Sequence, residues 1–445
     1  MLAAHSAAGT QHRLLASLAH ARSETDRLFD LVKPYSLYER PVPERHRIIF
    51  YLGHLEAFDW NLLHGHLPNS KPFHPEFDRL FAFGIDPVGG GLPTDQPADW
   101  PTATEVRDYR SRIRQTLDAG LATGWQTRSG SEEFSSSLLL NVAIEHRLMH
   151  AETFTYMLHQ LPIDRKIPQR GQGNARTPGR MVATSRMMEI PAGPARLGLS
   201  RDSTSFGWDN EYESHTVDVP RFAIDEHMVT NGQYLQFTKA GGYEDQSLWN
   251  EADWLWKTGR QISHPAFWKR TGDSWSYLAM FDERPLPLEW PVYVSHAEAS
   301  AYARWSGKAL PTEAEWHRAA YGTPDGHKRP YPWGSEPPTV EHGNFDFYDW
   351  DPAPVYAFPN GRSAFGVSGL LGNGWEWTSS RFEPFSGFQP FPFYRGYSAD
   401  FFDGKHYVIK GGSARTAACM LRRSFRNWFQ PHYQYVYAGF RCVSR

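Results

Sequence analysis

Two histidines stand four residues apart in "NVAIEHRLMHAET", residues 141–153, and their spacing suits metal chemistry. Side chains at positions i and i+4 of a helix share one face, with Cβ atoms about 6 Å apart. His146 and His150 could therefore bind one ion, and His54, on an i, i+4 stripe with Phe58, could be a third ligand. Neutral imidazoles suit iron, zinc, copper or nickel. The same spacing also fits three buried histidines that hydrogen-bond to carbonyls or carboxylates.

Other ligand patterns fit the chain less well. The zinc-protease motif requires a glutamate directly after the first histidine, and this chain has Arg147 there. Glu152 follows His150 by two residues, so it points about 200° around the helix from that histidine. His64 and His66 lie near the end of a predicted helix, where cationic side chains are favoured at the surface. These other residues are therefore not predicted as ligands.

Residues 1–163 are predicted to form a four-helix bundle that positions these histidines. Apolar residues at helical spacing, interrupted by proline-bearing segments, indicate helices over residues 7–32, 45–66, 102–121 and 132–160. Ser129 or Ser131 is the expected cap of the fourth helix, and Pro162 ends it. Bundle interiors commonly hold metal sites built from facing helices, so the three histidines are expected there.

The rest of the chain follows a different pattern. Residues 164–184 are polar, basic and rich in Gly and Pro, which predicts a linker. Beyond it, short runs with β-branched and aromatic residues alternate with turn residues, for example "HTVDVPRFAIDE", "VYVS" and "HYVIKGGSA". In this part, helices are expected only at 295–307 and 312–322. Residues 185–445 are thus predicted to be an α+β domain with much irregular structure.

Composition narrows the class of protein. The chain has 445 residues, of which 40% are hydrophobic, and a net charge of −3, so no global field favours nucleic acid or an anionic membrane. Two cysteines are too few for a disulfide framework. Polar residues interrupt the N-terminal apolar stretch, and no run approaches the roughly 20 apolar residues of a membrane span. We expect a cytoplasmic protein that acts on small molecules.

Several runs in the second half resemble the formylglycine-generating-enzyme-like domain. They are "MVTNGQYLQF", "WPVYVSHAEASAYARWSGKALPTEAEWHRAAYG", "YPWG", "GLLGNGWEWTSS" and the closing "GFRCV". This resemblance implies an irregular, C-type-lectin-like fold.

Over most of its length, the chain resembles the ergothioneine-type sulfoxide synthases. The resemblance rests on a DinB-like four-helix bundle, with one early histidine and a later HxxxH pair, that is followed by that domain. Those synthases are non-heme iron enzymes that use dioxygen to join a sulfur donor to the imidazole ring of hercynine, the trimethylated betaine of histidine.

The resemblance implies roles for residues at matching positions. Those implied as Fe(II) ligands are His54, His146 and His150. In "RSFRNWFQP", Asn427 and Trp428 match the pair that holds the hercynine betaine, with Phe429 beside them. Aromatic faces bind a trimethylammonium, which donates no hydrogen bond, and Trp375 could supply another face. Tyr394 or Tyr397 could transfer a proton or an electron, although tyrosines in such loops are more often packing residues.

Three departures from the family pattern predict a changed donor. "HLEAFDW" replaces the usual "HTTWFFE", Met149 replaces a glutamine that reaches the substrate imidazole, and residues 77–101 lack the expected tyrosines and basic cluster. A neutral selenosugar needs no basic residue to pair with a carboxylate. The sequence therefore favours the selenoneine synthases, which join a selenosugar to hercynine. The alternative is ergothioneine-type chemistry with cysteine or γ-glutamylcysteine.

Two further classes of function stay open. A formylglycine-generating enzyme would oxidise a protein cysteine with copper held by Cys419 and Cys442. A binding module without catalysis would use structural histidines in the bundle and an aromatic second half to hold a quaternary ammonium or a sugar.

Overall fold

The computed structural model describes residues 2–68, 70–82, 92–123, 134–169 and 186–445. The chain divides into two compact units, Met1–Gln169 and Arg170–Arg445, here called the helical unit and the mixed unit. The predicted linker, 164–184, lies mostly outside the described residues, so its bounds stay a prediction. Among the described residues, no helix combines the length and hydropathy needed to cross a bilayer.

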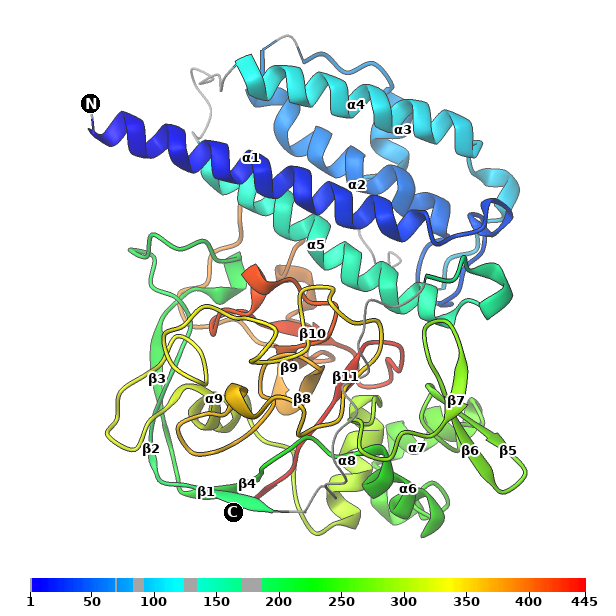
Figure 1. The fold of residues 1–445 in the computed structure, drawn as a ribbon, viewed down its shortest axis with the longest axis vertical. Coiled ribbons are helices and arrows are strands. Elements are labelled where there is room, and N and C mark those ends of the chain that lie inside the picture. Colours follow the sequence, from blue (N-terminus) through cyan, green and yellow to red (C-terminus); the bar gives the residue numbers. More distant parts are fainter. Residues whose placement is uncertain (1, 69, 83–91, 124–133, 170–185) are drawn as a thin grey trace. The chain divides into compact units, whose positions relative to one another are not determined.

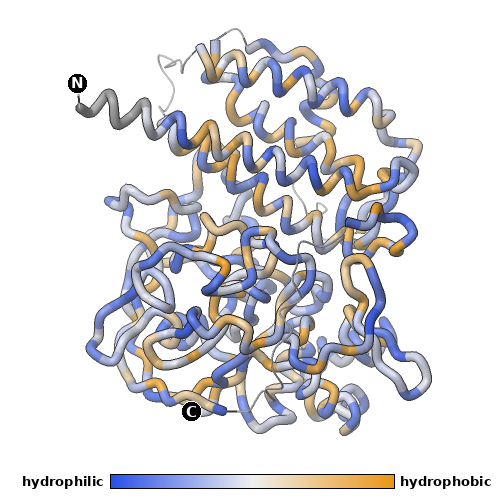
Figure 2. The backbone as a smooth tube through the Cα atoms, viewed as in Figure 1, coloured by the Kyte–Doolittle hydropathy of each residue, from blue (hydrophilic) through white to orange (hydrophobic). Residues whose placement is uncertain are grey.

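The helical unit is a bundle of four long helices with one short helix between the second and the third long one (Figure 1). Its helices are α1 (Leu2–Phe29), α2 (Ile48–Leu63), α3 (Pro75–Leu80), α4 (Ala103–Thr123) and α5 (Ser136–Gln160). Helix α1 packs along α5, while α2 packs against both α4 and α5. Hydrophobic and hydrophilic residues interleave along this unit (Figure 2), as expected for helices that bury part of their surface. The predicted bundle is confirmed.

Two details of the bundle differ from the sequence expectation. Helix α5 begins at Ser136, and Ser135 caps it by accepting a hydrogen bond from the Leu138 N–H at 3.1 Å. The predicted caps, Ser129 and Ser131, lie outside the described residues. Helix α3 was not predicted, because a segment with two prolines indicates a connection rather than a helix. Its start is nevertheless favourable, since Pro75 is the first helical residue and the His74 ring accepts from the Phe77 N–H.

The mixed unit combines small sheets with short helices. Its helices are α6 (Asn231–Lys239), α7 (Glu251–Gly259), α8 (His296–Trp305) and α9 (Glu313–Tyr321). Its strands are β1 (Met187–Ile190), β2 (Gly193–Leu197), β3 (His215–Val219), β4 (Phe222–Asp225), β5 (Trp268–Thr271), β6 (Ser274–Leu278), β7 (Glu283–Pro285), β8 (Gly374–Arg381), β9 (Tyr407–Gly412), β10 (Asn427–Phe429), β11 (Ala438–Gly439) and β12 (Val443–Ser444). The α+β class is confirmed.

The largest sheet carries the segment expected to bind substrate. Its strand order is β10-β9-β8-β11, with β10 antiparallel to β9 and β11 parallel to β8. Asn427 pairs with Ile409, and Ala438 pairs with Trp375. A fully buried ion pair also joins two of the sequence motifs, because Arg441 of "GFRCV" lies 2.6 Å from Glu376 of "GNGWEW". The sheet thus holds the C-terminal motifs in one rigid framework.

The structure of this unit differs from the sequence expectation in two respects: it has two helices that were not predicted, and it lacks one predicted strand. Helices α6 and α7, each nine residues long, were not predicted from the sequence. Both carry a start signal: Thr230 and Gln233 form a capping box before α6, and Asn250 caps α7. The run "VYVS" is not a strand, although Val292 and Val294 each donate a backbone hydrogen bond to a neighbouring segment.

Candidate metal centre and aromatic site

Three buried imidazoles from two helices come together inside the helical unit. Helix α2 supplies His54, and α5 supplies His146 and His150, each no more than 3% exposed. One ring nitrogen of each lies within 4.8 Å of those of the other two. Among the described residues, no other group of three His, Cys, Asp or Glu side chains meets that criterion. The predicted cluster of histidines is therefore present, and the structure brings all three together.

Neighbouring groups orient these rings. The His54 Nδ1–H donates to the carbonyl oxygen of Phe81 at 2.6 Å, which leaves Nε2 with its lone pair directed toward His150 Nε2, 3.2 Å away. The His54 ring stacks on Phe50 with centroids 4.8 Å apart, and the His146 ring lies parallel to Phe58 at 3.4 Å. Aromatic contacts and a backbone carbonyl thus restrict how the imidazoles can turn.

The three imidazoles are held neutral. Burial lowers the pKa of His54 to about 4, with smaller contributions from the charges of His46 and Arg147. Burial also lowers the pKa of His146 and His150 well below the ordinary value, and the neighbouring histidines add to the effect. Neutral imidazole is the form that binds a metal, so no proton has to be displaced at pH 7.

This donor set fits a divalent transition metal. Three neutral nitrogens match Fe(II), Co(II), Cu(II) or Zn(II), and three protein ligands leave positions for substrate or water. A backbone carbonyl that accepts the Nδ1–H of a ligand histidine is a usual outer partner in such sites, and Phe81 provides it to His54. The residues present therefore fit a metal ion.

The segment predicted to hold a betaine lies in the mixed unit beside an aromatic cluster. The Trp428 ring stacks on Phe382 with centroids 4.1 Å apart and a 7° interplanar angle. Tyr397 and Phe401 each lie 5.5 Å from the Trp428 ring. The Asn427 side-chain oxygen accepts from the Trp428 backbone N–H at 2.8 Å. Asn427 and Trp428 are both half-buried, so part of each side chain is accessible.

The two candidate tyrosines lie in a loop that packs on Trp208 and Asp209. The Tyr397 ring stacks on Trp208 at 3.9 Å and lies 5.7 Å from the Tyr394 ring. Asp209 accepts from the Ser398 hydroxyl at 2.7 Å, and burial raises the pKa of its carboxyl to about 6. Burial and the charge of Asp209 raise the pKa of Tyr394, so its hydroxyl stays protonated at neutral pH.

The remaining predicted site residues lie in different surroundings. Trp375 is 1% exposed in the core of the mixed unit, with its ring 6.0 Å from Phe425. Phe429 stacks on Tyr433 at 5.3 Å. Met149 is half-buried on α5 in the helical unit, directly before His150. The structure therefore places Tyr397 beside Trp428 and Tyr394 beside Tyr397, and it buries Trp375.

The surroundings of the two cysteines do not favour a copper site with thiolate ligands. Neither forms a disulfide; Cys419 is exposed and Cys442 is buried. Burial and the charge of Asp225 raise the pKa of the Cys442 thiol. A metal-binding thiol normally has a lowered pKa, because the thiolate is the ligand.

Sequence reasoning missed several residues that surround these sites. Phe81, the C-cap of the unpredicted α3, supplies the carbonyl to His54. Asp209 and Trp208 support the tyrosine loop from almost 190 residues earlier in the chain. Arg147 had been noted only for excluding the zinc-protease motif, yet it is fully buried in an ion cluster. The sequence feature that could have indicated the role of Arg147 is a charged residue inside an otherwise apolar helix.

Comparison with known proteins supports both domain expectations. Residues 17–154 match the DinB superfamily, and residues 174–445 match the sulfatase-modifying factor enzyme 1-like domain. The chain is also similar to the formylglycine-generating enzyme of Thermomonospora curvata, with 32% identity over 306 residues that cover 58% of this chain and 93% of that protein. That similarity spans only part of the present chain.

Two relatives match the chain along nearly its full length. It is 38% identical over 440 residues to the hercynine oxygenase of Mycolicibacterium thermoresistibile, covering 97% of this chain and 94% of that protein. It is 32% identical over 436 residues to the hercynine oxygenase of Mycolicibacterium smegmatis, covering 96% of this chain and 97% of that protein. The two domains occur here in the order expected from the sequence. The chain belongs to the hercynine oxygenase family.

Proposed function

We propose that this protein is an oxygen-dependent, iron-containing enzyme that joins a selenosugar to the imidazole ring of hercynine. The observation that carries the proposal is the group of three buried, neutral imidazoles from α2 and α5. Membership of the hercynine oxygenase family supports hercynine as the acceptor. The atoms balance when dioxygen is the oxidant: a ring C–H, a selenol and O₂ give a C–Se bond, a selenoxide and water.

His54, His146 and His150 are proposed to hold Fe(II), which when bound supplies the dioxygen chemistry. Phe81 keeps the His54 ring in the tautomer that offers Nε2 to the ion. Because the pKa of His54 is about 4, a fall in pH from 8 to 6 does not protonate this ligand. The ligand set therefore stays intact over the range in which most cytoplasmic enzymes work.

Asn427 and Trp428 are proposed to hold the betaine of hercynine, with Phe429 beside them. A trimethylammonium is attracted to aromatic faces, and the cluster around Trp428 offers several rings. The Asn427 amide is proposed to bind the carboxylate. Tyr394 is proposed as a proton donor, since its hydroxyl stays protonated, and Tyr397 as its packing partner or substitute. Trp375 is proposed to contribute by supporting this sheet.

A neutral donor fits the charge pattern near the first ligand. The half-buried Arg40 and Arg47, on the N-terminal side of α2, both pair with Asp95, with Arg47 Nε 2.9 Å from Asp95 Oδ2. Asp95 offsets one of these two positive charges, and both guanidiniums also donate to backbone carbonyls, of Pro93 and Tyr38, so protein groups already hold them. Met149 stands where the resemblance implies a glutamine that reaches the substrate imidazole, so a soft thioether replaces an amide at that position.

A thiol donor is the second candidate, because some relatives are named for ergothioneine biosynthesis. The chain is 28% identical to the ergothioneine biosynthesis protein 1 of Neurospora crassa over 92% of its own length and 55% of that protein. Cysteine or γ-glutamylcysteine would then take the place of the selenosugar. The residues proposed to bind iron and hercynine are the same in both cases.

A donor competition separates these candidates. Anaerobic, Fe(II)-loaded protein is mixed with hercynine, a selenosugar and γ-glutamylcysteine at equal concentration, oxygen is admitted, and products are identified by mass spectrometry. We expect a selenium-bearing hercynine adduct as the main product. A hercynine sulfoxide alone would replace the selenosugar proposal with ergothioneine-type chemistry.

Ligand variants test the iron site in the same assay. We expect His150→Ala to lose iron and product, whereas His64→Ala, which changes a half-buried histidine just after α2, should keep both. Full turnover by His150→Ala would overturn the proposed metal centre.

A further inference from the structure

A cluster of buried charges joins the two helices that carry the imidazoles. Arg147 follows His146 directly on α5, and Glu56 follows His54 by two residues on α2. Arg147 is turned about 100° from His146 around α5, and Glu56 is turned about 200° from His54 around α2. Both charged side chains therefore lie on other faces of these helices than the histidines do. Together with Asp59, Arg147 and Glu56 are fully buried. We call Arg147, Glu56 and Asp59 the Arg147 fork.

The contacts of the fork are numerous and directional. Arg147 Nη2 lies 2.6 Å from Asp59 Oδ2 and 3.0 Å from Glu56 Oε2, and Nη1 lies 3.1 Å from Glu56 Oε1. The same guanidinium donates to the backbone oxygen of Leu55 at 2.9 Å. One residue of α5 is therefore bound to three residues of α2, Leu55, Glu56 and Asp59, which lie within little more than one helical turn. Planar, bidentate contacts of this kind fix orientation as well as distance.

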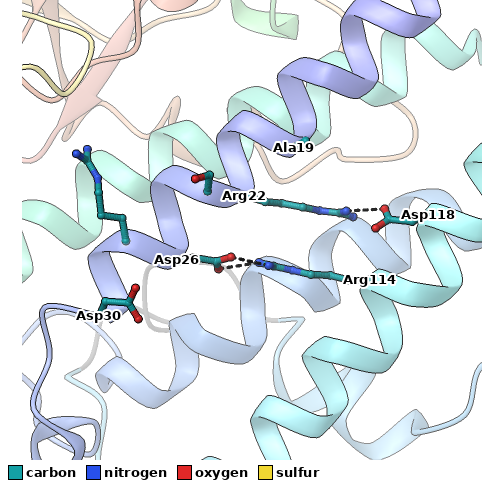
Figure 3. Close-up of a pocket in the computed structure, with 8 residues that line it drawn as sticks. Ala19, Arg22, Asp26, Asp30, Arg114 and Asp118 are labelled. Carbon is teal, nitrogen blue, oxygen red and sulfur yellow. Dashed lines mark hydrogen bonds and ion pairs between the residues drawn. The ribbon is translucent and has the colours of Figure 1, made fainter.

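Further charges attach the fork to the other two long helices. Arg114 of α4 donates to Glu56 Oε1 at 2.6 Å and binds both oxygens of Asp26 of α1, at 2.6 and 2.8 Å. Figure 3 shows this Asp26–Arg114 pair and the neighbouring Arg22–Asp118 pair at a surface pocket of about 430 Å³. Because Arg22 and Arg114 are paired with carboxylates of the pocket, and Arg27 with Glu24, we assign the pocket no ligand. The outer pairs instead extend the fork across the bundle.

Stability alone does not explain such a cluster. Burying charges carries a large desolvation cost, and well-packed hydrophobic residues of similar size often give equal or greater stability. A buried ion pair is better explained where it selects one arrangement over close alternatives. Apolar side chains between α2 and α5 would tolerate small sliding movements, whereas a metal site requires ligands placed to within about 0.5 Å.

We propose that Arg147 is a positioning residue for the metal centre: its fork on Glu56 and Asp59 sets the placement of α2 relative to α5, and with it the approach of His54 to His146 and His150. This inference rests on the proposed metal site and adds to it a residue that touches neither metal nor substrate. The fork acts on the separation between helices, while the Phe81 carbonyl acts on the orientation of one ring.

The test measures binding of Co(II) alone to metal-free, full-length protein, from its visible ligand-field spectrum and by competition with a chelator. We expect Arg147→Met to weaken Co(II) binding by about tenfold or more, as is usual when outer-shell residues of metal sites are removed, and to change the spectrum. Arg147→Lys retains one charge but not the fork, so its affinity should be intermediate.

A matched control removes a different buried arginine. Arg441 lies 2.6 Å from Glu376 in the mixed unit, and both are as fully buried as the Arg147 fork. Arg441→Met should therefore carry a similar folding penalty but change Co(II) affinity by less than about twofold, because it belongs to the other compact unit. The folded state of each variant is checked by circular dichroism before titration.

Each outcome bears on the proposal. A folded Arg147→Met protein with the affinity and spectrum of the wild type would overturn the positioning role. If Arg147→Met does not fold, Asp59→Asn decides, since it removes one arm of the fork with an isosteric side chain; unchanged Co(II) binding in that variant overturns the proposal. The variant His150→Ala distinguishes a failure of the proposed metal centre from a failure of the positioning role. If it binds Co(II) as the wild type does, the metal centre itself is refuted and the positioning role falls with it.

Discussion

At the residue scale, the neighbours of His54 restrict its ring in the way that the proposed metal site requires. Its Nδ1–H is committed to the Phe81 carbonyl, its ring is stacked on Phe50, and burial keeps it neutral. An isolated imidazole has two tautomers and rotates freely, so it must lose that freedom when it binds an ion. Here the surrounding residues have already removed it.

Gly53 provides a direct test of the Phe81 contact. A Cβ atom at Gly53 would lie 2.6 Å from three atoms of the Phe81 ring, which is a severe overlap. We expect Gly53→Ala to displace Phe81, to lengthen the hydrogen bond to His54 and to lower the free energy of unfolding by about 1–3 kcal/mol. Chemical denaturation and metal affinity are the measurements. Gly9→Ala on α1, where the nearest atom lies 4.0 Å from the added Cβ, should cost no stability.

The pKa of His54 predicts how stability depends on pH. Burial lowers this pKa to about 4, whereas an unfolded histidine titrates near 6.5. Between these values the unfolded chain binds a proton that the folded state does not, so the free energy of unfolding of the metal-free protein falls as pH falls. The difference corresponds to about 3 kcal/mol for this group, fully lost below pH 4.

Urea denaturation of the metal-free protein at pH 7 and pH 5 measures this dependence. His54→Phe should show a weaker dependence than the wild type, because it lacks the group that binds the extra proton on unfolding. An equally steep dependence in both proteins would contradict the assignment.

At the scale of elements, the sequence predicted the long helices better than the short ones. Helices α2, α4 and α5 carry apolar stripes over many turns, so periodicity alone located them. Helices α3, α6 and α7 have six to nine residues and were missed although caps mark their starts, whereas α9, also of nine residues, was predicted. The three histidines could be predicted from spacing, but the Phe81 carbonyl could not, since α3 was not recognised.

The start of α5 gives a prediction about this helix. Ser135 accepts from the Leu138 N–H, one of the first amides of α5, which would otherwise lack a helical partner. Ser135→Ala should lower the free energy of unfolding by about 1 kcal/mol, while Ser137→Ala, inside the first turn, should have a smaller effect. Chemical denaturation of both variants is the measurement. Equal losses would show that Ser135 does not act as the cap.

At the scale of the whole molecule, the chain contains two units with separate cores, and each has its own buried arginine. Arg147 is bound to Glu56 and Asp59 in the helical unit, and Arg441 is bound to Glu376 in the mixed unit. Removing one partner of a buried pair typically costs about 3–5 kcal/mol. We therefore expect each substitution to destabilise its own unit.

Calorimetry of the full-length chain checks this independence. We expect Arg147→Met to lower the unfolding temperature of one transition by several degrees, and Arg441→Met to lower that of another. A single transition that both substitutions shift equally would show that the units unfold together.

The sequence located both domains and the ligand candidates, because motifs and helical spacing are local properties. Donor selectivity is different. It depends on pocket contacts from segments far apart in the chain, and part of the region with the largest departures, residues 83–91, lies outside the described residues. Asp209 and Trp208, which support the tyrosine loop, were likewise invisible in the sequence because their partners lie far along the chain.

The metal-ligand candidates stand on two long, capped or cross-linked helices, whereas the tyrosines and the residues beside Trp428 stand mostly on irregular segments. Changes in loops are tolerated far more readily than changes in packed helices. Laboratory evolution toward a new nucleophile should therefore accumulate its first useful substitutions in residues 382–402 and leave α2 and α5 untouched. The proposed metal centre on packed helices, combined with the proposed substrate-binding residues on loops, would make this scaffold a versatile starting point for biocatalyst design.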